Sequence, residues 1–326
     1  MLVLGIESTA HTFGIGIIDC RKKEILFNER SQFSGEEGMD LRKLSDFHVS
    51  NFDSVLIKAR DFLKSKNKTF KNIDLISFSQ GPGIGNSLKI GALVAKALSL
   101  EYGVPIVGVN HIKAHLEIGK MLTGFSDPMF LYVSGVNTQI IAKDKTSYKI
   151  YGETEDIGLG NLLDSFARLV GLDFPGGPKI EKLALKSKNF IPLPYTVKGM
   201  NVSLGGLYSN LKKKCEEDCK VEDLCYSLQE TAFAMLMEIT ERAIAYTKKK
   251  EFVIVGGVAA NKRLEKMARA MCKERDVKYD YFPMEYAMDN GAMVAWQGFV
   301  EKAKAKKVGD ISKLMPNAYV NVESEL

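Results

Sequence analysis

The chain has 326 residues, 45% of them hydrophobic, a composition that supports a large folded core with more than one lobe. Its 45 basic and 40 acidic residues leave a net charge of +5, which permits an anionic partner without requiring one. No apolar run reaches the roughly 18 residues of a membrane-spanning helix, and residues 1–6 lack the basic start of a signal peptide, so we expect a cytoplasmic protein that does not engage a membrane.

The first half begins with a predicted hairpin. Two apolar strands, residues 2–6 and 13–19, flank a polar turn at residues 7–12. Small and hydroxyl side chains in such a turn let a phosphate approach the backbone, and a plain β-turn is the alternative. A second hairpin of the same kind covers residues 129–142, after a turn-rich boundary at residues 124–128. The repetition predicts a duplicated fold with a cleft between its halves.

Strands and helices alternate between the two hairpins. We predict a helix over residues 41–66, a strand over 73–79, a helix over 88–101 and a strand over 105–109, an order that indicates a parallel sheet. The glycine-rich loop at residues 80–87 lacks both the GK[ST] pair and the third glycine of phosphate-loop motifs. We interpret it as a tight turn whose amides remain free for an anion.

The second half continues with the same two kinds of element. We predict helices over 161–170, from near 179, over 222–249, over 262–274 and over 292–305, with strands at 252–255 and 279–282. Residues 186–207 lack periodicity, and the tail from Val308 is expected to be polar and weakly structured. The glycine pair in the loop at residues 256–261 can let a flat adenine ring lie against the backbone.

Two of the four histidines, His111 and His115, stand four residues apart at the start of a predicted helix. Both rings then point to one side and can share one metal ion, although two half-exposed histidines are the alternative. Further candidate ligands are Asp289, otherwise a helix cap, and Tyr132, otherwise a strand aromatic. Such nitrogen and oxygen ligands suit iron or zinc. The cysteines show no complete zinc spacing, and we interpret them as structural thiols, with a metal role less favoured: Cys20, Cys215, Cys219, Cys225 and Cys272.

Six ordered motifs carry a resemblance to a known family. They are Val109-Asn110-His111-x3-His115, Tyr132-Val133-Ser134-Gly135-x-Asn137-Thr138-Gln139, Asp164-x-Phe166-Ala167-Arg168, Pro175-Gly176-Gly177-Pro178-x-Ile180-Glu181, Gly256-Gly257-Val258-Ala259-Ala260-Asn261 and Asp289-Asn290-Gly291-Ala292-Met293. Together they resemble the Gcp/TsaD family of tRNA threonylcarbamoyladenosine transferases, formerly named O-sialoglycoprotein endopeptidase. The archaeal-eukaryotic style of the motifs resembles the catalytic subunit of the KEOPS complex.

The resemblance implies an α/β fold of the actin-like, sugar-kinase-like (ASKHA) class, with two ribonuclease-H-like lobes and an interlobe cleft. We expect an N-terminal lobe at 1–125, and a C-terminal lobe at 126–295 that carries the nucleotide and metal motifs. Residues 296–326 would form a final helix, packing back on the first lobe, and a polar tail.

The reaction implied is transfer of a threonylcarbamoyl group from threonylcarbamoyl-AMP to the adenosine 3′ of the anticodon, in tRNAs reading ANN codons (t6A). The resemblance implies one metal ion per subunit, iron or else zinc, and a nucleotide ligand, ATP, AMP or threonylcarbamoyl-AMP, with or without magnesium. It assigns catalysis to Glu7, His111, His115 and Asp289, and metal ligation to His111, His115, Tyr132 and Asp289. It assigns substrate and nucleotide binding to Thr9, Tyr132, Val133, Ser134, Gly135, Val136, Asn137, Asp164, Gly177, Glu181, Gly256, Gly257 and Asn261. The implied partners are tRNA and the KEOPS subunits: a small atypical kinase or ATPase, a dimerising subunit and a tRNA-binding subunit.

Three positions depart from the family pattern. Val136 stands where glycine is usual, and a β-branched residue resists positive φ, so we expect an altered turn with weaker ligand binding. A first-lobe motif that usually carries paired histidines has only His48, and Ala287-Met288 stands where Cys-Thr is common.

Three other functions were weighed. A zinc protease needs the glutamate of HExxH as general base, but Ile112 occupies that position. A sugar kinase or ATPase of the same fold transfers phosphate with an acidic residue and magnesium, and does not need paired histidines. A non-catalytic scaffold, like the degenerate paralogues of this family, would lack both the histidine pair and the adenine loop.

Overall fold

The computed structural model describes residues 1–33, 41–217 and 219–324. Within these residues the chain forms two compact units: unit 1 comprises 1–33, 41–122 and 288–324, and unit 2 comprises 123–217 and 219–287. The first crossing, after Leu122, agrees with the turn-rich boundary in the sequence. The return at Met288 differs from the predicted boundary at residue 296. Asp289 and the start of the last helix, up to residue 295, therefore belong to unit 1, not to the C-terminal lobe.

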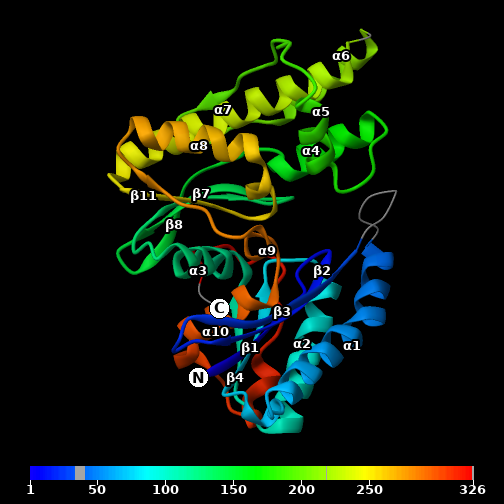
Figure 1. Ribbon diagram of the computed structural model, residues 1–326, viewed down its shortest axis with the longest axis vertical. Coiled ribbons are helices and arrows are strands. Elements are labelled where there is room, and N and C mark those ends of the chain that lie inside the picture. Colours follow the sequence, from blue (N-terminus) through cyan, green and yellow to red (C-terminus); the bar gives the residue numbers. More distant parts are fainter. Residues whose placement is uncertain (34–40, 218, 325–326) are drawn as a thin grey trace. The chain divides into compact units, whose positions relative to one another are not determined.

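The sheet of unit 1 has five strands in the order β3-β2-β1-β4-β5 (Figure 1). β1 and β2 form the predicted hairpin, with Glu7 opposite Gly14, and β3 adds a further antiparallel strand that we had not predicted. β4 and β5 run parallel to β1, as the alternation of strands and helices predicted. The bounds are β1 Leu2–Glu7, β2 Thr12–Asp19, β3 Glu24–Gln32, β4 Leu75–Gly81 and β5 Ile106–Asn110.

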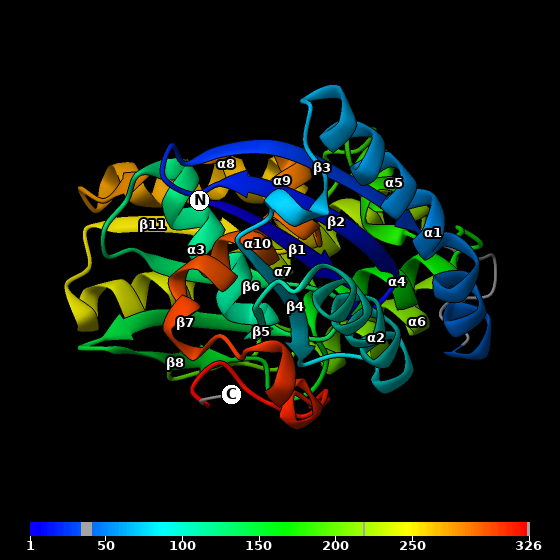
Figure 2. The ribbon, with the colours of Figure 1, turned by 90° about the horizontal axis from the view of Figure 1, so that it is seen from below.

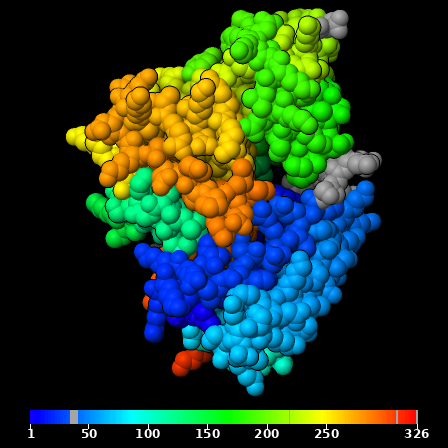
Figure 3. Space-filling model, in the orientation of Figure 1, coloured from blue at the N-terminus to red at the C-terminus, as the bar shows by residue number. Residues whose placement is uncertain are grey.

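Both faces of this sheet are covered, because its strands are apolar on both sides. Leu4 and Ile6 of β1 pack with α1 (Leu41–Ser65) and α2 (Gly85–Tyr102), whereas Val3 packs with α3 (His111–Thr123) and α10 (Gly291–Val300). This division follows from the two-residue period of a strand. A short helical turn, η1 (Phe70–Asn72), precedes β4. In Figure 3, residues of β3 and α1, drawn in blue shades, form much of the visible surface of unit 1.

The contact of α10 with the sheet is a backbone-to-backbone contact. A Cβ atom added to Gly5 would lie 2.2 Å from the amide nitrogen of Ala295, and one added to Gly16 would lie 2.1 Å from that of Ala292. Gly291 lies equally close to β2, because its own Cβ would lie 2.0 Å from the amide nitrogen of Gly16. Glycine alone permits this approach, which holds the start of α10 over the sheet.

The carboxyl-terminal segment is ordered against unit 1, so the prediction of a weakly structured tail was wrong. Helix α10 ends at Val300 instead of continuing to residue 305, and two short turns follow, η3 (Lys302–Lys304) and η4 (Val308–Lys313). Beyond them, the amide of Asn317 donates to the carbonyl of Gln80 (2.8 Å), and Val322 is fully buried. Figure 2 shows the segment in red, running past β5 and α2. Buried apolar residues within a polar stretch hold it in place.

The sheet of unit 2 has the order β12-β11-β6-β7-β8. Read from the other edge, β8-β7-β6-β11-β12, it repeats the order of unit 1, with β6 in the place of β1. β6, β7 and β8 form the antiparallel meander, and β11 and β12 run parallel to β6. The predicted duplication is confirmed. β8 was not predicted, and β12 is shorter than the strand expected at 279–282. The bounds are β6 Met129–Val133, β7 Thr138–Asp144, β8 Ser147–Glu153, β11 Glu251–Val255 and β12 Lys278–Tyr279.

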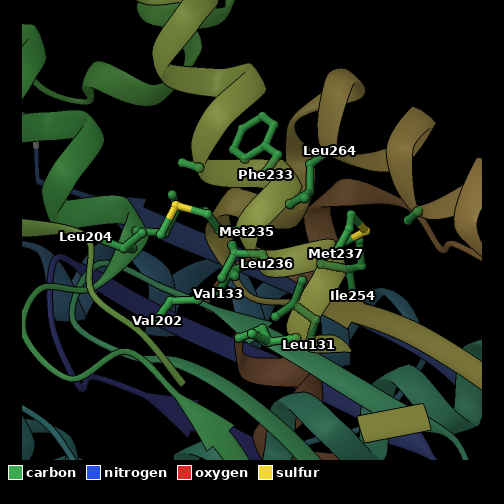
Figure 4. Close-up of a cluster of buried hydrophobic side chains, with 14 of the residues drawn as sticks. Leu131, Val133, Val202, Leu204, Phe233, Met235, Leu236, Met237, Ile254 and Leu264 are labelled. Carbon is green, nitrogen blue, oxygen red and sulfur yellow. The ribbon is translucent and has the colours of Figure 1, made fainter. Parts of the chain in front are cut away.

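The core of unit 2 lies between this sheet and the long helix α7. Leu131 and Val133 of β6 point toward Leu236 and Met237 of α7 (Figure 4). The remaining elements are α4 Leu159–Leu169, α5 Gly176–Ala184, β9 Val197–Lys198, β10 Asn201–Val202, α6 Gly205–Glu216, α7 Val221–Thr247, η2 Gly257–Ala260, α8 Lys262–Glu274 and α9 Met284–Ala287. Among the described residues, no helix is both long enough and apolar enough to cross a membrane.

Candidate active site

The parallel strands of unit 1 bring distant residues to one edge of the sheet. β1, β4 and β5 are parallel, so their carboxyl ends lie at the same edge. Glu7 is the last residue of β1, Ser79 lies near the end of β4, and His111 begins the helix after β5. The close packing of α10 brings Asp289, just before that helix, to the same edge. A buried cluster of ionisable side chains results.

Three of these side chains converge on one point. Nε2 of His115 lies 3.1 Å from Oδ1 of Asp289, and Nε2 of His111 lies 3.5 Å from the same oxygen. The exposed fractions of His111 and His115 are 6% and 1%, so they are not the half-exposed pair of the alternative reading. The ligand atoms of all three residues lie within 4.8 Å of one another. Of the described cysteines, none joins a comparable group.

This geometry fits a metal ion. Metal–nitrogen and metal–oxygen bonds of about 2.0–2.1 Å place neighbouring ligand atoms about 2.8–3.0 Å apart in octahedral coordination and about 3.3–3.4 Å apart in tetrahedral coordination. The two separations in the cluster, 3.1 and 3.5 Å, match that range with little movement. His111, His115 and Asp289 are therefore the residues that would hold the ion, and two imidazoles with one carboxylate suit iron or zinc.

Two asparagines orient the helices that carry these ligands. Oδ1 of Asn110 accepts the amides of Ile112 and Lys113, which caps α3 and aims His111 and His115 at one side. Oδ1 of Asn290 accepts the amide of Met293 and caps α10. Because Asn290 takes the capping role, the carboxylate of Asp289 can face the histidines, and Asp289 is not the helix cap that was its alternative role.

Glu7 lies behind His111 and is fully buried. Its Oε2 accepts from Nδ1 of His111 (3.0 Å) and from the hydroxyl of Ser79. Its Oε1 accepts the amide (2.7 Å) and the hydroxyl (2.5 Å) of Thr9. Ser79 was absent from the predicted site, although two hydroxyl residues, Ser77 and Ser79, in the otherwise apolar residues 75–79 were a visible signal.

The charges of the cluster shift its pKa values in opposite directions. Burial alone lowers the pKa of His111, but the carboxylates of Glu7 and Asp289 raise it to about 9. Burial alone raises the pKa of Glu7 and of Asp289, but in both the charge of His111 and hydrogen bonds from the histidines prevail and lower it. Burial lowers the pKa of His115. The edge therefore stabilises cationic charge between two carboxylates.

Tyr132 lies in unit 2, near the end of β6, and is 1% exposed. It alternates with Leu131 and Val133, whose side chains point into the core between the sheet and α7, so its ring lies on the other face. Its ligation of the ion remains a prediction.

The predicted phosphate turn of unit 2 is tied to the start of α4. The amide of Ser134 donates to the carbonyl of Asn137 (2.8 Å), and the amide of Asn161 donates to the carbonyl of Gly135 (2.8 Å). Val136 is 68% exposed and is not among the described residues with positive φ. The strain expected for a β-branched residue at this position is therefore not present.

The predicted ribose-binding residues lie around α5. Oδ1 of Asp164 accepts the amide of Gly176 (2.8 Å) at the start of α5, which Gly177 continues. Oε1 of Glu181, one turn further along, accepts the amide of Lys262 (2.7 Å) at the start of α8. The structure thus places Asp164, Gly177 and Glu181 in or beside α5, and the carboxylates of Asp164 and Glu181 fix the starts of α5 and α8.

The predicted adenine loop joins β11 to α8. Gly256 has φ +98°, and a Cβ atom there would lie 2.4 Å from the carbonyl oxygen of Val133, so this position requires glycine. A Cβ atom on Gly257 would meet nothing within 4 Å, which leaves space for a flat ring. Asn261 is only 4% exposed; it caps α8 through Oδ1 and donates from Nδ2 to Gln229 (2.6 Å). Its side chain therefore stabilises the loop through contacts with α7 and α8.

Two features near the first turn have structural roles. The glycine-rich loop does not offer all its amides to an anion, since Gly83 and Ile84 donate to the carbonyls of Ala318 and Thr9. His48 of α1 is fully buried and contacts the carbonyl of Ala10 through Nε2 (2.7 Å). Burial lowers its pKa, and its Nε2 donates to that carbonyl and holds the turn.

Comparison with known proteins gives the family. Residues 33–296 match the family model described as TsaD, tRNA N6-adenosine threonylcarbamoyltransferase. The chain belongs to the TsaD family. Proteins named tRNA N6-adenosine threonylcarbamoyltransferase from Nanoarchaeum equitans and Thermococcus kodakarensis are each 49% identical to it. The alignments cover 92% and 91% of this chain and 93% and 90% of those TsaD relatives.

Another TsaD relative is longer. A protein named probable bifunctional tRNA threonylcarbamoyladenosine biosynthesis protein, from Methanocaldococcus jannaschii, is 47% identical over 97% of this chain. The chain spans 58% of the length of that relative.

Solved structures support the fold. HypF from T. kodakarensis aligns with a TM-score of 0.64 at 17% identity, over 92% of this chain and 47% of HypF. The activator of 2-hydroxyisocaproyl-CoA dehydratase from Clostridium difficile, with bound ADPNP, aligns with a TM-score of 0.55 at 14% identity, over 98% of this chain and 100% of the activator. The two repeated sheets and these likenesses confirm the ASKHA-type α/β fold predicted for this TsaD chain.

Proposed function

We propose that this chain transfers a threonylcarbamoyl group from threonylcarbamoyl-AMP to the N6 amine of the adenosine 3′ of the anticodon in tRNA. The observation that carries the proposal is the convergence of His111, His115 and Asp289 at the strand edge of a TsaD-family chain. Close relatives carry the transferase name over more than nine-tenths of this chain.

The chemistry of the reaction fits the donors that this chain offers. The adenine amine is a weak nucleophile and AMP is a good leaving group, so the catalyst must orient and polarise the acyl carbonyl. An ion held by His111, His115 and Asp289 would supply Lewis-acid polarisation, with iron favoured over zinc. We assign Tyr132 as a fourth ligand. The turn at residues 134–137 would place the amides of Gly135 and Val136 near the developing negative charge, since those of Ser134 and Asn137 donate within the turn.

The nucleotide part of the donor would bind in unit 2. Asp164 and Glu181 offer carboxylates for ribose hydroxyls, and Gly256 and Gly257 offer open backbone for adenine. ATP, AMP or threonylcarbamoyl-AMP fits this assignment, with or without magnesium.

We expect the activity in the cytoplasm and within the KEOPS complex. A net charge of only +5 gives the chain a weak and salt-sensitive grip on tRNA. A small atypical kinase or ATPase, a dimerising subunit and a tRNA-binding subunit would complete the assembly, and a separate enzyme would supply threonylcarbamoyl-AMP.

A metalloprotease is not supported by this site. The zincin mechanism needs a glutamate one residue after the first histidine, and Ile112 there is apolar and 2% exposed. A kinase or ATPase of the same fold remains the second candidate, favoured by the likeness to an activator solved with ADPNP.

The decisive test follows labelled threonine and bicarbonate into tRNA with all partners present. We expect labelled t6A with the parent chain, and a loss of at least about 100-fold with His111→Asn or Asp289→Asn, which limit the cavity that alanine would leave in this buried site. The paired variant Glu117→Ala with Lys120→Ala, further along α3, is the control and should retain activity. Parent-like rates in the ligand variants, or t6A without this chain, would overturn the proposal.

A further inference from the structure

The buried carboxylate of Glu7 is surrounded by hydrogen-bond donors. Ser79 and Thr9 contribute hydroxyls, Thr9 contributes its amide, and Nδ1 of His111 lies 3.0 Å from Oε2. Glu7 has an exposed fraction of 0%, so it does not present an oxygen to solvent. It contacts the proposed metal centre only through His111, and a role as a residue that touches the substrate does not fit this position.

We propose that Glu7 is a positioning residue that fixes the proton of His111 on Nδ1 and leaves Nε2 as the metal-binding nitrogen. This rests on the metal centre proposed above. A carboxylate can only accept, so Nδ1 must be the donor. Nε2 then faces Oδ1 of Asp289 at 3.5 Å and carries the lone pair that a metal ion requires.

The network around Glu7 gives this assignment a sharp consequence. In the Glu7→Gln variant, the backbone amide of Thr9 still needs an acceptor where Oε1 of Glu7 lies. The side-chain oxygen of the glutamine must therefore occupy that position. The glutamine NH2 group then replaces Oε2 and points at Nδ1 of His111. Ser79 can adapt, because its hydroxyl can accept. The NH2 group opposes a proton on Nδ1 and favours Nδ1 as an acceptor, which moves the proton to Nε2 and blocks the metal-binding lone pair; against this, the Thr9 hydroxyl oxygen, 3.3 Å from Nδ1, offers a weaker acceptor for that proton. A substitution of almost the same shape therefore favours the other tautomer of His111, with the proton on Nε2.

Ser79→Ala is the matched control. It removes one donor from the same oxygen of Glu7 but keeps the carboxylate, so Nδ1 of His111 still faces an acceptor. If the identity of the acceptor matters, the control should bind metal nearly as the parent does. If only packing matters, both variants should lose affinity alike.

The experiment titrates the purified full chain with Co²⁺ and follows the absorption of the bound ion. We expect Glu7→Gln to lose affinity by on the order of 10–100-fold, and Ser79→Ala by less than about threefold. Thermal unfolding of each variant checks that the fold persists. Nuclear magnetic resonance of protein with nitrogen-15-labelled histidine and bound Zn²⁺ then shows which ring nitrogen carries the proton and which binds the metal. We expect a protonated Nδ1 and a metal-bound Nε2 for His111.

Parent-like affinity in Glu7→Gln, an equal loss in Ser79→Ala, or an Nδ1-bound metal in the parent would each overturn the assignment. Should Glu7→Gln fail to fold, the ring spectrum of the parent decides alone. If the parent binds neither ion, the metal centre itself is wrong. The assignment of Nε2 as the metal-binding nitrogen then falls with it. Formation of t6A tests the transferase separately.

Discussion

Units 1 and 2 share one sheet order but place different chemistry at the ends of their strands. In unit 1, the edge formed by β1, β4 and β5 carries Glu7, His111 and Asp289, all ionisable and mostly buried. In unit 2, the corresponding strand β6 ends in a turn whose polar groups are mainly backbone, and β11 ends at Gly256. Topology therefore determines where a ligand can bind, and the side chains determine which ligand it is.

The helices beside these strand ends are held in two ways, by glycine contacts with backbone and by side-chain caps. In unit 1, α10 rests on β1 and β2 through glycines, and Asp289 precedes it directly. In unit 2, side chains such as Asn261, Asp164 and Asp156 hold the helix starts through hydrogen bonds. Backbone packing tolerates no added atom, whereas a hydrogen-bonded cap can be replaced in part. Substitution of a glycine that touches backbone should therefore have a larger effect than substitution of a cap.

The largest effect is expected at the ligand cluster of unit 1. His111→Asn with His115→Asn should lower the metal content from about one ion per chain to nearly none, because two of three ligands are lost. Elemental analysis of purified protein measures this. Glu117→Ala with Lys120→Ala on the same helix should keep the ion; an unchanged content in the double histidine variant would remove the metal assignment.

Next is the glycine contact beneath α10. Gly16→Ala places a Cβ atom 2.1 Å from the backbone of Ala292, which cannot yield without moving the helix, so we expect a loss of about 3 kcal/mol or more in the free energy of unfolding. Gly206→Ala in unit 2, where a Cβ meets nothing within 4 Å, should be neutral or stabilising. Urea unfolding of both variants measures the difference. Equal free energies of unfolding for the Gly16→Ala and Gly206→Ala variants would contradict the claim that the close backbone contact beneath α10 tolerates no added atom.

A smaller effect is expected at Asn261. Asn261→Ala removes the cap of α8 and leaves Oε1 of Gln229 unpaired, which should cost about 2 kcal/mol of folding free energy. Asn261→Asp keeps the cap and should lose less. Denaturant unfolding gives the stabilities, and calorimetry with AMP gives the affinity. A variant of parental stability that loses AMP binding would restore Asn261 as a direct ligand-binding residue.

The smallest effect concerns Asp156, an exposed carboxylate at the start of α6. Burial alone raises its pKa, but hydrogen bonds from the Ser203 hydroxyl and the amides of Leu204, Ile157 and Gly205 lower it to about 2. A lowered pKa stabilises the fold above the unfolded value near 4, and this contribution disappears as the pH falls through about 2. Asp156→Asn should therefore lose less than about 1 kcal/mol at pH 7, and the difference from the parent should shrink toward pH 2. A difference independent of pH would exclude the charge as its origin.

The sequence by itself determined most of the elements and half of the site. The apolar alternation of residues 2–6 and 129–133 predicted strands, and the four-residue spacing of His111 and His115 predicted two rings on one helix face. These features are local, since the periods of strands and helices act over a few residues. The edge strands β3 and β8 were missed because their exposed, polar residues weaken that periodicity.

Only the tertiary structure decided which distant residues meet. The contact of Glu7 with His111 joins residues 104 positions apart, and it depends on β1, β4 and β5 lying parallel. The return of Asp289 to unit 1 depends on glycines in β1 and β2 that accept a helix backbone, a complementarity without periodic signature. The carboxyl-terminal tail is mostly polar, yet it is held by the burial of Val322 and by hydrogen bonds from Gln80 of β4 and Asn110 of β5. Long-range pairing depends on the shape and register of surfaces that form only when the chain has folded.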